Sequence, residues 1–210
     1  MISLPPIPTL VQRTKALAAL DLILSPDWQY RYYSFNSNWA SNEQMASMRD
    51  GCGDEWWIVF HKSEWAALKG LGHESEAWSA HRDRLSNALR DVIPSELNGF
   101  AEEPAFRWDA TSFAYFYVSK SEGWKRANDL AGFARDKDTG EEELLQPLIS
   151  PAANYSRFAE NYFETSVPIE IVDSIFSLQP ITQDVVNRIN ADVDLADIST
   201  ELFEEIGYPR

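Results

Sequence analysis

Tryptophan and charge are distributed unevenly along this chain of 210 residues, and this distribution constrains the fold more than any other feature. All eight tryptophans lie between Trp28 and Trp124. Residues 1–137 hold 15 basic and 18 acidic residues, whereas residues 138–210 hold 3 basic and 15 acidic ones. Large aromatic side chains drive the packing of a core, and a strongly charged segment keeps its charges in solvent. We therefore predict a single domain over residues 1–210, with a tryptophan-rich body at 1–137 and an acidic subregion at 138–210.

The body contains patterns that are typical of strands, with alternating or continuous apolar residues. Four segments have such a pattern: Tyr30–Asn36, Trp56–Phe60, Trp65–Leu71 and Thr111–Ser119. The spacing of apolar residues predicts helices at Thr9–Ile23 and Ser79–Val92 instead. Trp56 and Trp57 point to opposite faces of a strand, so either one of them is an exposed binding anchor or the sheet is covered on both sides.

The acidic subregion is predicted to be helical throughout. The expected helices cover Glu141–Leu148, Asn154–Glu164 and Ile169–Leu178, with two more that begin after Thr182 and after Asp194 or Asp197. Thr and Asp are good N-caps, and Gly207 followed by Pro209 is a normal helix stop. The predicted fold class is α+β, with an antiparallel sheet in the N-terminal two thirds and a helical, acidic C-terminal third.

Two acidic residues flank glycines in the segment Arg49-Asp50-Gly51-Cys52-Gly53-Asp54-Glu55, and Gly72-His73-Glu74-Ser75 follows after two predicted strands. Carboxylates and a histidine can bind a divalent cation or a small molecule, or act as acid and base in a hydrolase. In that case the ligand-binding residues are Asp50, Asp54, Glu55, His73 and Glu74. The alternative is a β-turn in which Asp50 bonds the backbone and the glycines adopt positive φ, and turn chemistry favours it.

Recognisable catalytic and cofactor motifs are absent from the sequence: it has no G-x-S-x-G, no P-loop and no G-x-G-x-x-G. The three histidines lack metal-ligand spacing, and nothing around Cys52 marks it as a nucleophile. We therefore expect no catalytic residue, no metal and no cofactor. A single cysteine allows no intrachain disulfide, and no signal peptide or membrane-spanning apolar run is evident, so we expect a cytoplasmic protein.

The formal net charge of −15 limits the partners that such a protein can bind. Sequence-independent binding of nucleic acid needs a basic surface, and an anionic lipid surface would repel this chain. A concentrated negative field instead attracts a basic protein and speeds its association. The expected partner-binding residues are the clustered glutamates of the acidic third: Glu141, Glu142, Glu143, Glu201, Glu204 and Glu205.

Several stretches of the chain resemble a family of bacterial proteins for which we know no reaction, cofactor or catalytic residue. The most distinctive are Arg49-Asp50-Gly51, continued by Gly53-Asp54, and Gly72-His73-Glu74-Ser75; the others are Tyr32 to Trp39, Met45 to Met48, Glu103 to Phe106 and Ile206 to Pro209. Ile93-Pro94-Ser95-Glu96-Leu97, with Phe100 after it, is similar to an element of the SUKH-type immunity proteins of bacterial toxin systems. That resemblance implies a small α+β domain, and immunity proteins that block basic nuclease toxins are commonly acidic.

The leading hypothesis is a cytoplasmic bacterial protein that acts by binding another protein, in the manner of an immunity protein or antitoxin. The alternative is a metal- or small-molecule-binding protein or a hydrolase that uses Asp50, Asp54, His73 and Glu74. A small-molecule binder with Trp56 or Trp57 in an open cleft is a third hypothesis.

Overall fold

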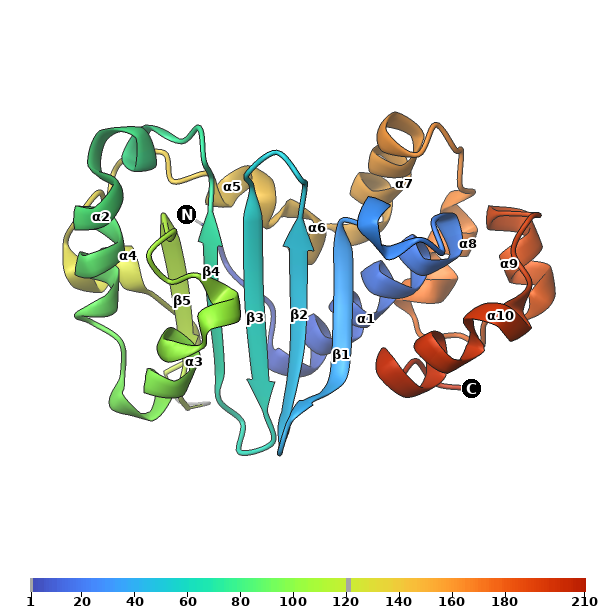
Figure 1. Ribbon diagram of the computed structural model, residues 1–210, viewed down its shortest axis with the longest axis horizontal. Helices are drawn as coiled ribbons and strands as arrows, with labels where there is room; N and C mark the ends of the chain where they lie inside the picture. Colours follow the sequence, from blue (N-terminus) through green and yellow to red (C-terminus); the bar gives the residue numbers. More distant parts are fainter. Residues whose placement is uncertain (1, 120–121) are drawn as a thin grey trace. The chain divides into compact units, whose positions relative to one another are not determined.

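The computed structural model describes residues 2–119 and 122–210. Six strands form one antiparallel sheet in the order β1-β2-β3-β4-β5-β6, and helices make up most of the remaining structure (Figure 1). The strands are β1 (Tyr33–Ala40), β2 (Glu43–Arg49), β3 (Glu55–His61), β4 (Ala66–Leu71), β5 (Phe113–Tyr117) and β6 (Lys125–Arg126). All of them lie in the N-terminal two thirds, so the predicted α+β class is confirmed.

Ten α-helices are found in the described residues: α1 (Ile7–Leu24), α2 (Glu76–Arg90), α3 (Asn98–Glu102), α4 (Ala127–Ala131), α5 (Glu141–Leu144), α6 (Gln146–Ile149), α7 (Pro151–Tyr162), α8 (Ile169–Phe176), α9 (Gln183–Ile189) and α10 (Leu195–Thr200). Four short helical turns complete the structure: η1 (Trp28–Tyr30), η2 (Ser95–Leu97), η3 (Pro104–Phe106) and the π-helical η4 (Glu201–Glu205). No helix in the described part of the chain has the length and apolar character that crossing a bilayer requires.

The chain forms two compact units, each assembled from separate segments. Unit 1 comprises Met1–Leu4 and Ser47–Leu145, and unit 2 comprises Pro5–Ala46 and Gln146–Arg210. The sequence-based division at residue 137 stays a prediction.

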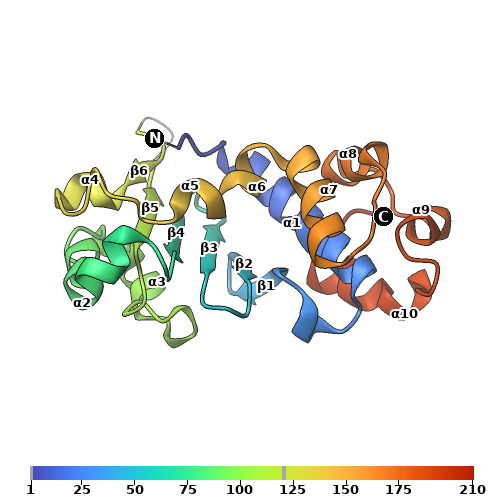
Figure 2. The ribbon, with the colours of Figure 1, turned by 90° about the horizontal axis from the view of Figure 1, so that it is seen from above.

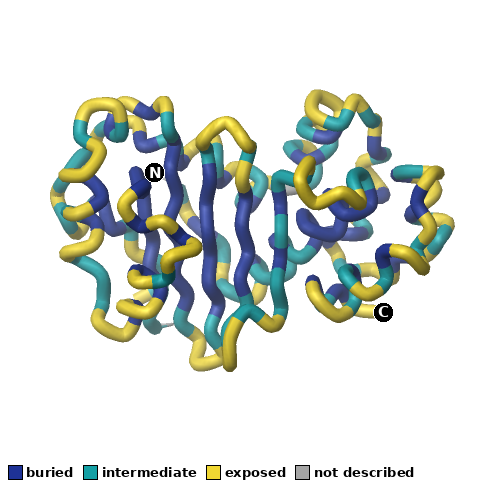
Figure 3. The backbone as a smooth tube through the Cα atoms, in the orientation of Figure 1, coloured by how far each residue is buried: buried dark blue, intermediate teal, exposed yellow. Residues whose placement is uncertain are grey.

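Unit 1 is built on strands β3, β4 and β5, and β3 and β4 are buried over almost their whole length (Figure 3). In the antiparallel register of β3 and β4, Trp56 faces Gly70 and Trp57 faces Lys69. Trp56 is 1% exposed and Trp57 is 8% exposed, so both tryptophans belong to the core. Helix α4 contacts β5 and β6, as seen from above in Figure 2. The two adjacent tryptophans are therefore covered on both faces and do not line an open aromatic cleft.

Unit 2 is organised around α1, which contacts β1, α6, α8 and α9. The helix is rich in small and aliphatic residues, and from Ala16 to Ile23 every residue is buried. Residues from the far end of the sequence fix it in place: the ammonium group of Lys15 donates a hydrogen bond of 2.8 Å to the carbonyl oxygen of Gly207. Helices α8, α9 and α10 bury Ile and Val residues and leave their carboxylates in solvent, which is the amphipathic pattern of a surface helix.

Two sequence predictions differ from the structure in a way that has a clear physical reason. The single helix expected over 141–148 is two four-residue helices, α5 and α6, that meet at Leu145. Pro147 explains the interruption, because proline has no N–H and cannot donate the hydrogen bond that a continuous helix would need at this position. The strand expected from Tyr30 begins at Tyr33 instead, since Trp28–Tyr30 forms the helical turn η1.

Candidate functional site

The predicted polar site begins at the turn that joins β2 to β3. One carboxylate oxygen of Asp50, Oδ1, accepts hydrogen bonds from the backbone N–H groups of Cys52, Gly53 and Asp54 at 2.8, 2.9 and 2.9 Å. The backbone N–H of Asp50 donates to the carbonyl oxygen of Asp54 at 3.1 Å. Gly51 and Gly53 have φ angles of 75° and 133°, which glycine adopts without strain. Asp50 therefore acts first as the structural centre of the turn.

Asp54 and His73 form the polar pair nearest to this turn. Oδ1 of Asp54 lies 2.8 Å from Nδ1 of His73 and also accepts the backbone N–H of His73 at 2.8 Å. The hydrogen bond to Asp54 raises the pKa of His73 above its ordinary value, and the charges of Asp54, Glu74 and Asp50 act in the same direction. When the ring is neutral and Nδ1–H donates to Asp54, Nε2 is left with a free lone pair.

The structure thus brings four of the five predicted residues into one surface cluster, which we call the turn cluster: Asp50, Asp54, His73 and Glu74. Nε2 of His73 lies 3.8 Å from Oε1 of Glu74, whose side chain is 88% exposed. This arrangement supplies one oriented imidazole and one solvent-exposed carboxylate. In residues 2–119 and 122–210, no three His, Cys, Asp or Glu side chains are grouped closely enough to hold a metal ion.

Glu55 is separate from the turn cluster because it belongs to a buried ion pair. Its Oε1 atom lies 2.7 Å from Nζ of Lys69, which also donates to the carbonyl oxygen of Ala110 at 2.9 Å. Lys69 is fully buried, and this burial lowers its pKa. A buried charge pair of this kind satisfies its own hydrogen bonds and offers nothing to a ligand.

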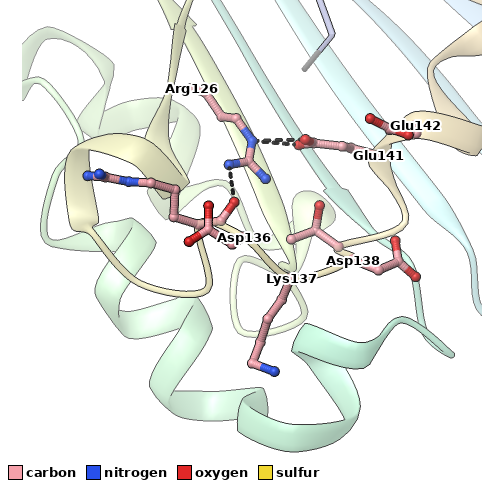
Figure 4. A pocket seen from close by; sticks show the side chains of 8 residues that line it. Arg126, Asp136, Lys137, Asp138, Glu141 and Glu142 are labelled. Atoms are coloured by element: carbon pink, nitrogen blue, oxygen red, sulfur yellow. Dashed lines mark hydrogen bonds and ion pairs between the residues drawn. The ribbon is translucent and has the colours of Figure 1, made fainter.

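A cavity of about 460 Å³ lies in unit 1 between the loop that follows α4 and the start of α5 (Figure 4). Its charged lining residues have both signs; they are Arg126, Arg135, Lys137, Asp136, Asp138, Glu141 and Glu142. Nε of Arg126 lies 2.9 Å from Oε1 of Glu141, and Nη1 of Arg126 lies 3.1 Å from Oδ1 of Asp129. The most buried cation of the cavity is thus already neutralised, and the lining does not favour one sign of ligand charge.

The six glutamates predicted to bind a partner are found in different surroundings. Glu141 is 6% exposed and paired with Arg126, while Glu142 and Glu143 are exposed in unit 1. In unit 2, Glu201 pairs with Arg31, whereas Glu204 and Glu205 are exposed. Glu141 is therefore a structural residue, and Glu204 and Glu205 are the members of the set in unit 2 that are open to solvent.

Unit 2 contains further exposed carboxylates in the same stretch of the sequence as Glu204 and Glu205. Residues 183–205, which we call the acidic segment, hold seven acidic residues and one basic residue. Its exposed acidic residues are Asp184, Asp192, Asp194, Asp197, Glu204 and Glu205. The overall charge of this region predicted a partner-binding surface, but only its glutamates were among the predicted binding residues. The alternation of these acids with buried Val186, Ile189, Ile198 and Leu202 was the signal that would have revealed the larger surface.

Comparisons with protein-family models, with curated proteins and with solved structures found no match for this chain.

Proposed function

We propose that the protein acts by binding a basic protein partner and that the acidic segment of unit 2 is the surface that attracts it. The observation that carries this proposal is the exposure of six carboxylates between Asp184 and Glu205, where Arg188 is the only basic residue. Arg188 is itself paired, since its Nη2 atom lies 2.8 Å from Oε1 of Glu170. The segment therefore presents a nearly unopposed negative field.

The backbone of this segment is well supported, which holds the charges at defined positions. Oγ1 of Thr182 accepts the backbone N–H of Val185 at the start of α9, and Oδ1 of Asp194 accepts the backbone N–H of Ala196 at the start of α10. The hydroxyl of Tyr208 donates to the carbonyl oxygen of Gln179 at 2.8 Å. Charges on a fixed surface steer an oppositely charged protein and raise its association rate by about 10- to 1000-fold at low salt.

An immunity protein that neutralises a basic toxin in the bacterial cytoplasm is the biological role that we propose. The similarity of Ile93 to Leu97 to an element of SUKH-type immunity proteins supports this role, and so does the acidic surface. The single cysteine, Cys52, is exposed, which suits a reducing compartment.

Charge reversal at three exposed positions tests the proposal. In the test variant Asp192, Glu204 and Glu205 are replaced by Lys, and in the control variant Asp83, Asp91 and Glu102 of unit 1 are replaced by Lys. All six residues are exposed, and both variants change the net charge from −15 to −9. Each tagged protein is incubated with a lysate of the cells that produce it, at about 50 mM and about 300 mM salt, and retained proteins are identified by mass spectrometry.

The expected result is a basic protein that the wild type and the control variant retain at low salt and that the test variant loses. Its purified form should associate with the test variant at least about tenfold more slowly than with the wild type, and salt should reduce the difference. Equal retention by the test and control variants would overturn the assignment of the surface. Retention of no basic protein by the wild type would overturn the function itself.

A second candidate function is the binding of a cation by two residues of the turn cluster, Nε2 of His73 and the exposed carboxylate of Glu74, and the orientation of His73 by Asp54 favours it. Titration of the wild type with Zn²⁺, followed through the His73 imidazole signals by NMR, tests it. Saturable shifts that disappear in Glu74→Gln would support a site. Shifts that are absent, or that remain unchanged in Glu74→Gln, would remove this candidate.

A further inference from the structure

A short turn in unit 2 exposes two large aromatic side chains. Trp28 and Tyr30 belong to η1, between α1 and β1, and they are 64% and 57% exposed. Among the described residues they are the most exposed large hydrophobic side chains. Tryptophan and tyrosine are enriched among the residues that dominate binding energy in protein interfaces. Their exposure on one turn marks this place as a candidate docking surface.

Local hydrogen bonds hold the turn in one conformation. The carboxylate of Asp27 accepts the backbone N–H of Gln29 at 3.4 Å and the side-chain amide of Gln29 at 2.7 Å. Nε of Arg31 donates to the carbonyl oxygen of Ser25 at 2.7 Å, which closes the other side of the turn. A turn that is already ordered loses little conformational entropy when a partner binds, so its contacts contribute more to affinity.

The acidic segment touches the chain on both sides of this turn. The side-chain amide of Asn190 donates to the carbonyl oxygens of Ile23 and Leu24 at 3.1 and 3.2 Å, just before the turn. Nη2 of Arg31 lies 3.2 Å from Oε2 of Glu201, just after the turn. These contacts place both ends of the turn that carries Trp28 and Tyr30 next to the acidic segment, at Asn190 and at Glu201.

A third exposed aromatic residue lies against the chain that follows the turn. The ring of Tyr162, at the end of α7, lies 4.4 Å from the ring of Tyr32, measured between centroids, and Tyr162 is 41% exposed. Tyr32 follows directly after Arg31 in the chain. An aromatic centre bordered by charged residues is the general anatomy of a protein–protein interface.

We propose that Trp28 and Tyr30 are the anchors of a docking surface for an arginine-rich surface of a partner protein. This inference rests on the proposed function and specifies the chemistry of the partner. The guanidinium group of arginine is planar and weakly hydrated, so it stacks on indole and phenol rings while it pairs with a nearby carboxylate such as that of Asp27, which precedes Trp28 in the chain. The ammonium group of lysine is strongly hydrated and gains less from the rings.

Two peptides of equal charge separate stacking from simple charge attraction. The wild-type protein is titrated with fluorescein-labelled hexa-arginine and hexa-lysine, and binding is followed by fluorescence anisotropy. The test variant is Trp28→Ala combined with Tyr30→Ala. The control variant is Leu130→Ala combined with Ile169→Ala, because these two apolar residues are 52% and 51% exposed. An unchanged thermal unfolding midpoint shows that each variant is folded.

The expected result is that hexa-arginine binds the test variant about tenfold more weakly than the wild type, which is the effect of two exposed cation–π contacts. The affinity of hexa-lysine should fall by about twofold or less in the test variant. The control variant should bind both peptides as the wild type does. Equal losses for the two peptides, or no loss in the test variant, would overturn the docking surface. The docking surface can fail while the proposed function survives. That is the outcome if the binding of both peptides is still weakened by the triple variant Asp192→Lys, Glu204→Lys and Glu205→Lys. If no variant affects either peptide, both proposals fail.

Self-association is the other way in which these rings could be covered. Light scattering of the wild type and the test variant distinguishes a different protein from a second copy of this chain as the binding partner. A monomer in both cases supports docking of a different protein. A wild-type dimer that becomes monomeric in the test variant would assign the surface to a second copy of this chain and overturn the proposal.

Discussion

The hydroxyl group of Tyr155 donates a hydrogen bond of 2.6 Å to Oδ1 of Asp21, which lies 134 residues earlier in the chain. The other oxygen of Asp21, Oδ2, accepts the backbone N–H groups of Tyr32 and Tyr33 at 2.8 and 2.9 Å. One fully buried carboxyl group thus joins α1 to the start of β1 and to α7. Burial raises the pKa of Asp21 to about 7, although these hydrogen bonds and the charge of Arg31 partly oppose the shift.

This raised pKa predicts that stability falls as the pH rises toward neutrality. The folded state binds the Asp21 proton more tightly than the unfolded state, so its contribution is complete below about pH 4 and is lost as the pH rises through about 7. Asp21→Asn removes this dependence and retains a neutral, hydrogen-bonded side chain. From pH 5 to pH 8 the wild type should lose roughly 1–4 kcal/mol of unfolding free energy relative to Asp21→Asn, measured by urea denaturation. Parallel pH profiles for the two proteins would contradict the prediction.

The buried pair of Lys69 and Glu55 predicts a strong coupling between two substitutions. Lys69→Met leaves the Glu55 carboxylate without its cation and should cost about 3–5 kcal/mol. Glu55→Leu combined with Lys69→Met removes both charges and should cost at least about 1 kcal/mol less than Lys69→Met alone. Urea denaturation of the two single variants and the double variant completes the cycle. Additive losses would show that the two side chains act independently.

The geometry of Asp54 and His73 predicts how the histidine titrates. Because the hydrogen bond to Asp54 raises its pKa, His73 should titrate above its ordinary value in the wild type and closer to it in Asp54→Asn. Glu74→Gln should have a smaller effect, since Nε2 of His73 is 3.8 Å from an exposed carboxylate. NMR titration of the imidazole C–H signals, assigned with His73→Gln, measures the pKa of His73 in the wild type, in Asp54→Asn and in Glu74→Gln. The pair of Asp54 and protonated His73 stabilises the folded state at low pH. This stabilisation is lost as the pH rises through the pKa of His73 in the folded protein.

Two glycines in the same turn predict different costs for alanine. At Gly51, which has a φ of 75°, a Cβ atom would meet nothing within 4 Å, so Gly51→Ala should cost about 1 kcal/mol from backbone strain alone. At Gly53, which has a φ of 133°, a Cβ atom would lie 2.8 Å from Cγ of His73. Gly53→Ala should therefore be at least about 1 kcal/mol more destabilising than Gly51→Ala in thermal or urea unfolding. Equal costs would argue against the close packing of His73 on this turn.

The sequence predicts the fold best where local pattern and tertiary structure agree. The apolar periodicity of Thr9–Ile23 corresponds to α1, and the continuous run Trp56–Phe60 corresponds to β3. Strand β2 was not predicted, because Glu43–Arg49 mixes polar and small residues and its burial depends on neighbours that the local pattern does not contain. Composition also failed to separate core aromatics from exposed ones: Trp56 is buried, whereas Trp28 is largely in solvent.

The candidate site was predictable only in part, and the reason is sequence separation. The turn chemistry around Asp50 is local, so its backbone hydrogen bonds could be expected from the glycines. The pairing of Asp54 with His73 joins residues 19 positions apart, and the pairing of Glu55 with Lys69 joins residues 14 positions apart. Neighbouring Asp54 and Glu55 thus have quite different roles, which depend on the strand register and not on residue type.

Unit 2 joins Pro5–Ala46 to Gln146–Arg210, and this arrangement sets the order of events during synthesis. Helix α1 is synthesised before the groups that bond to it: Lys15 donates to the carbonyl oxygen of Gly207, and Asn190 donates to the last carbonyl oxygens of the helix. Unit 1 draws most of its residues from one continuous stretch, Ser47–Leu145, and can form first. The nascent chain therefore carries Trp28 and Tyr30 before the carboxylates of the acidic segment exist, and the complete surface forms only once translation has passed that segment.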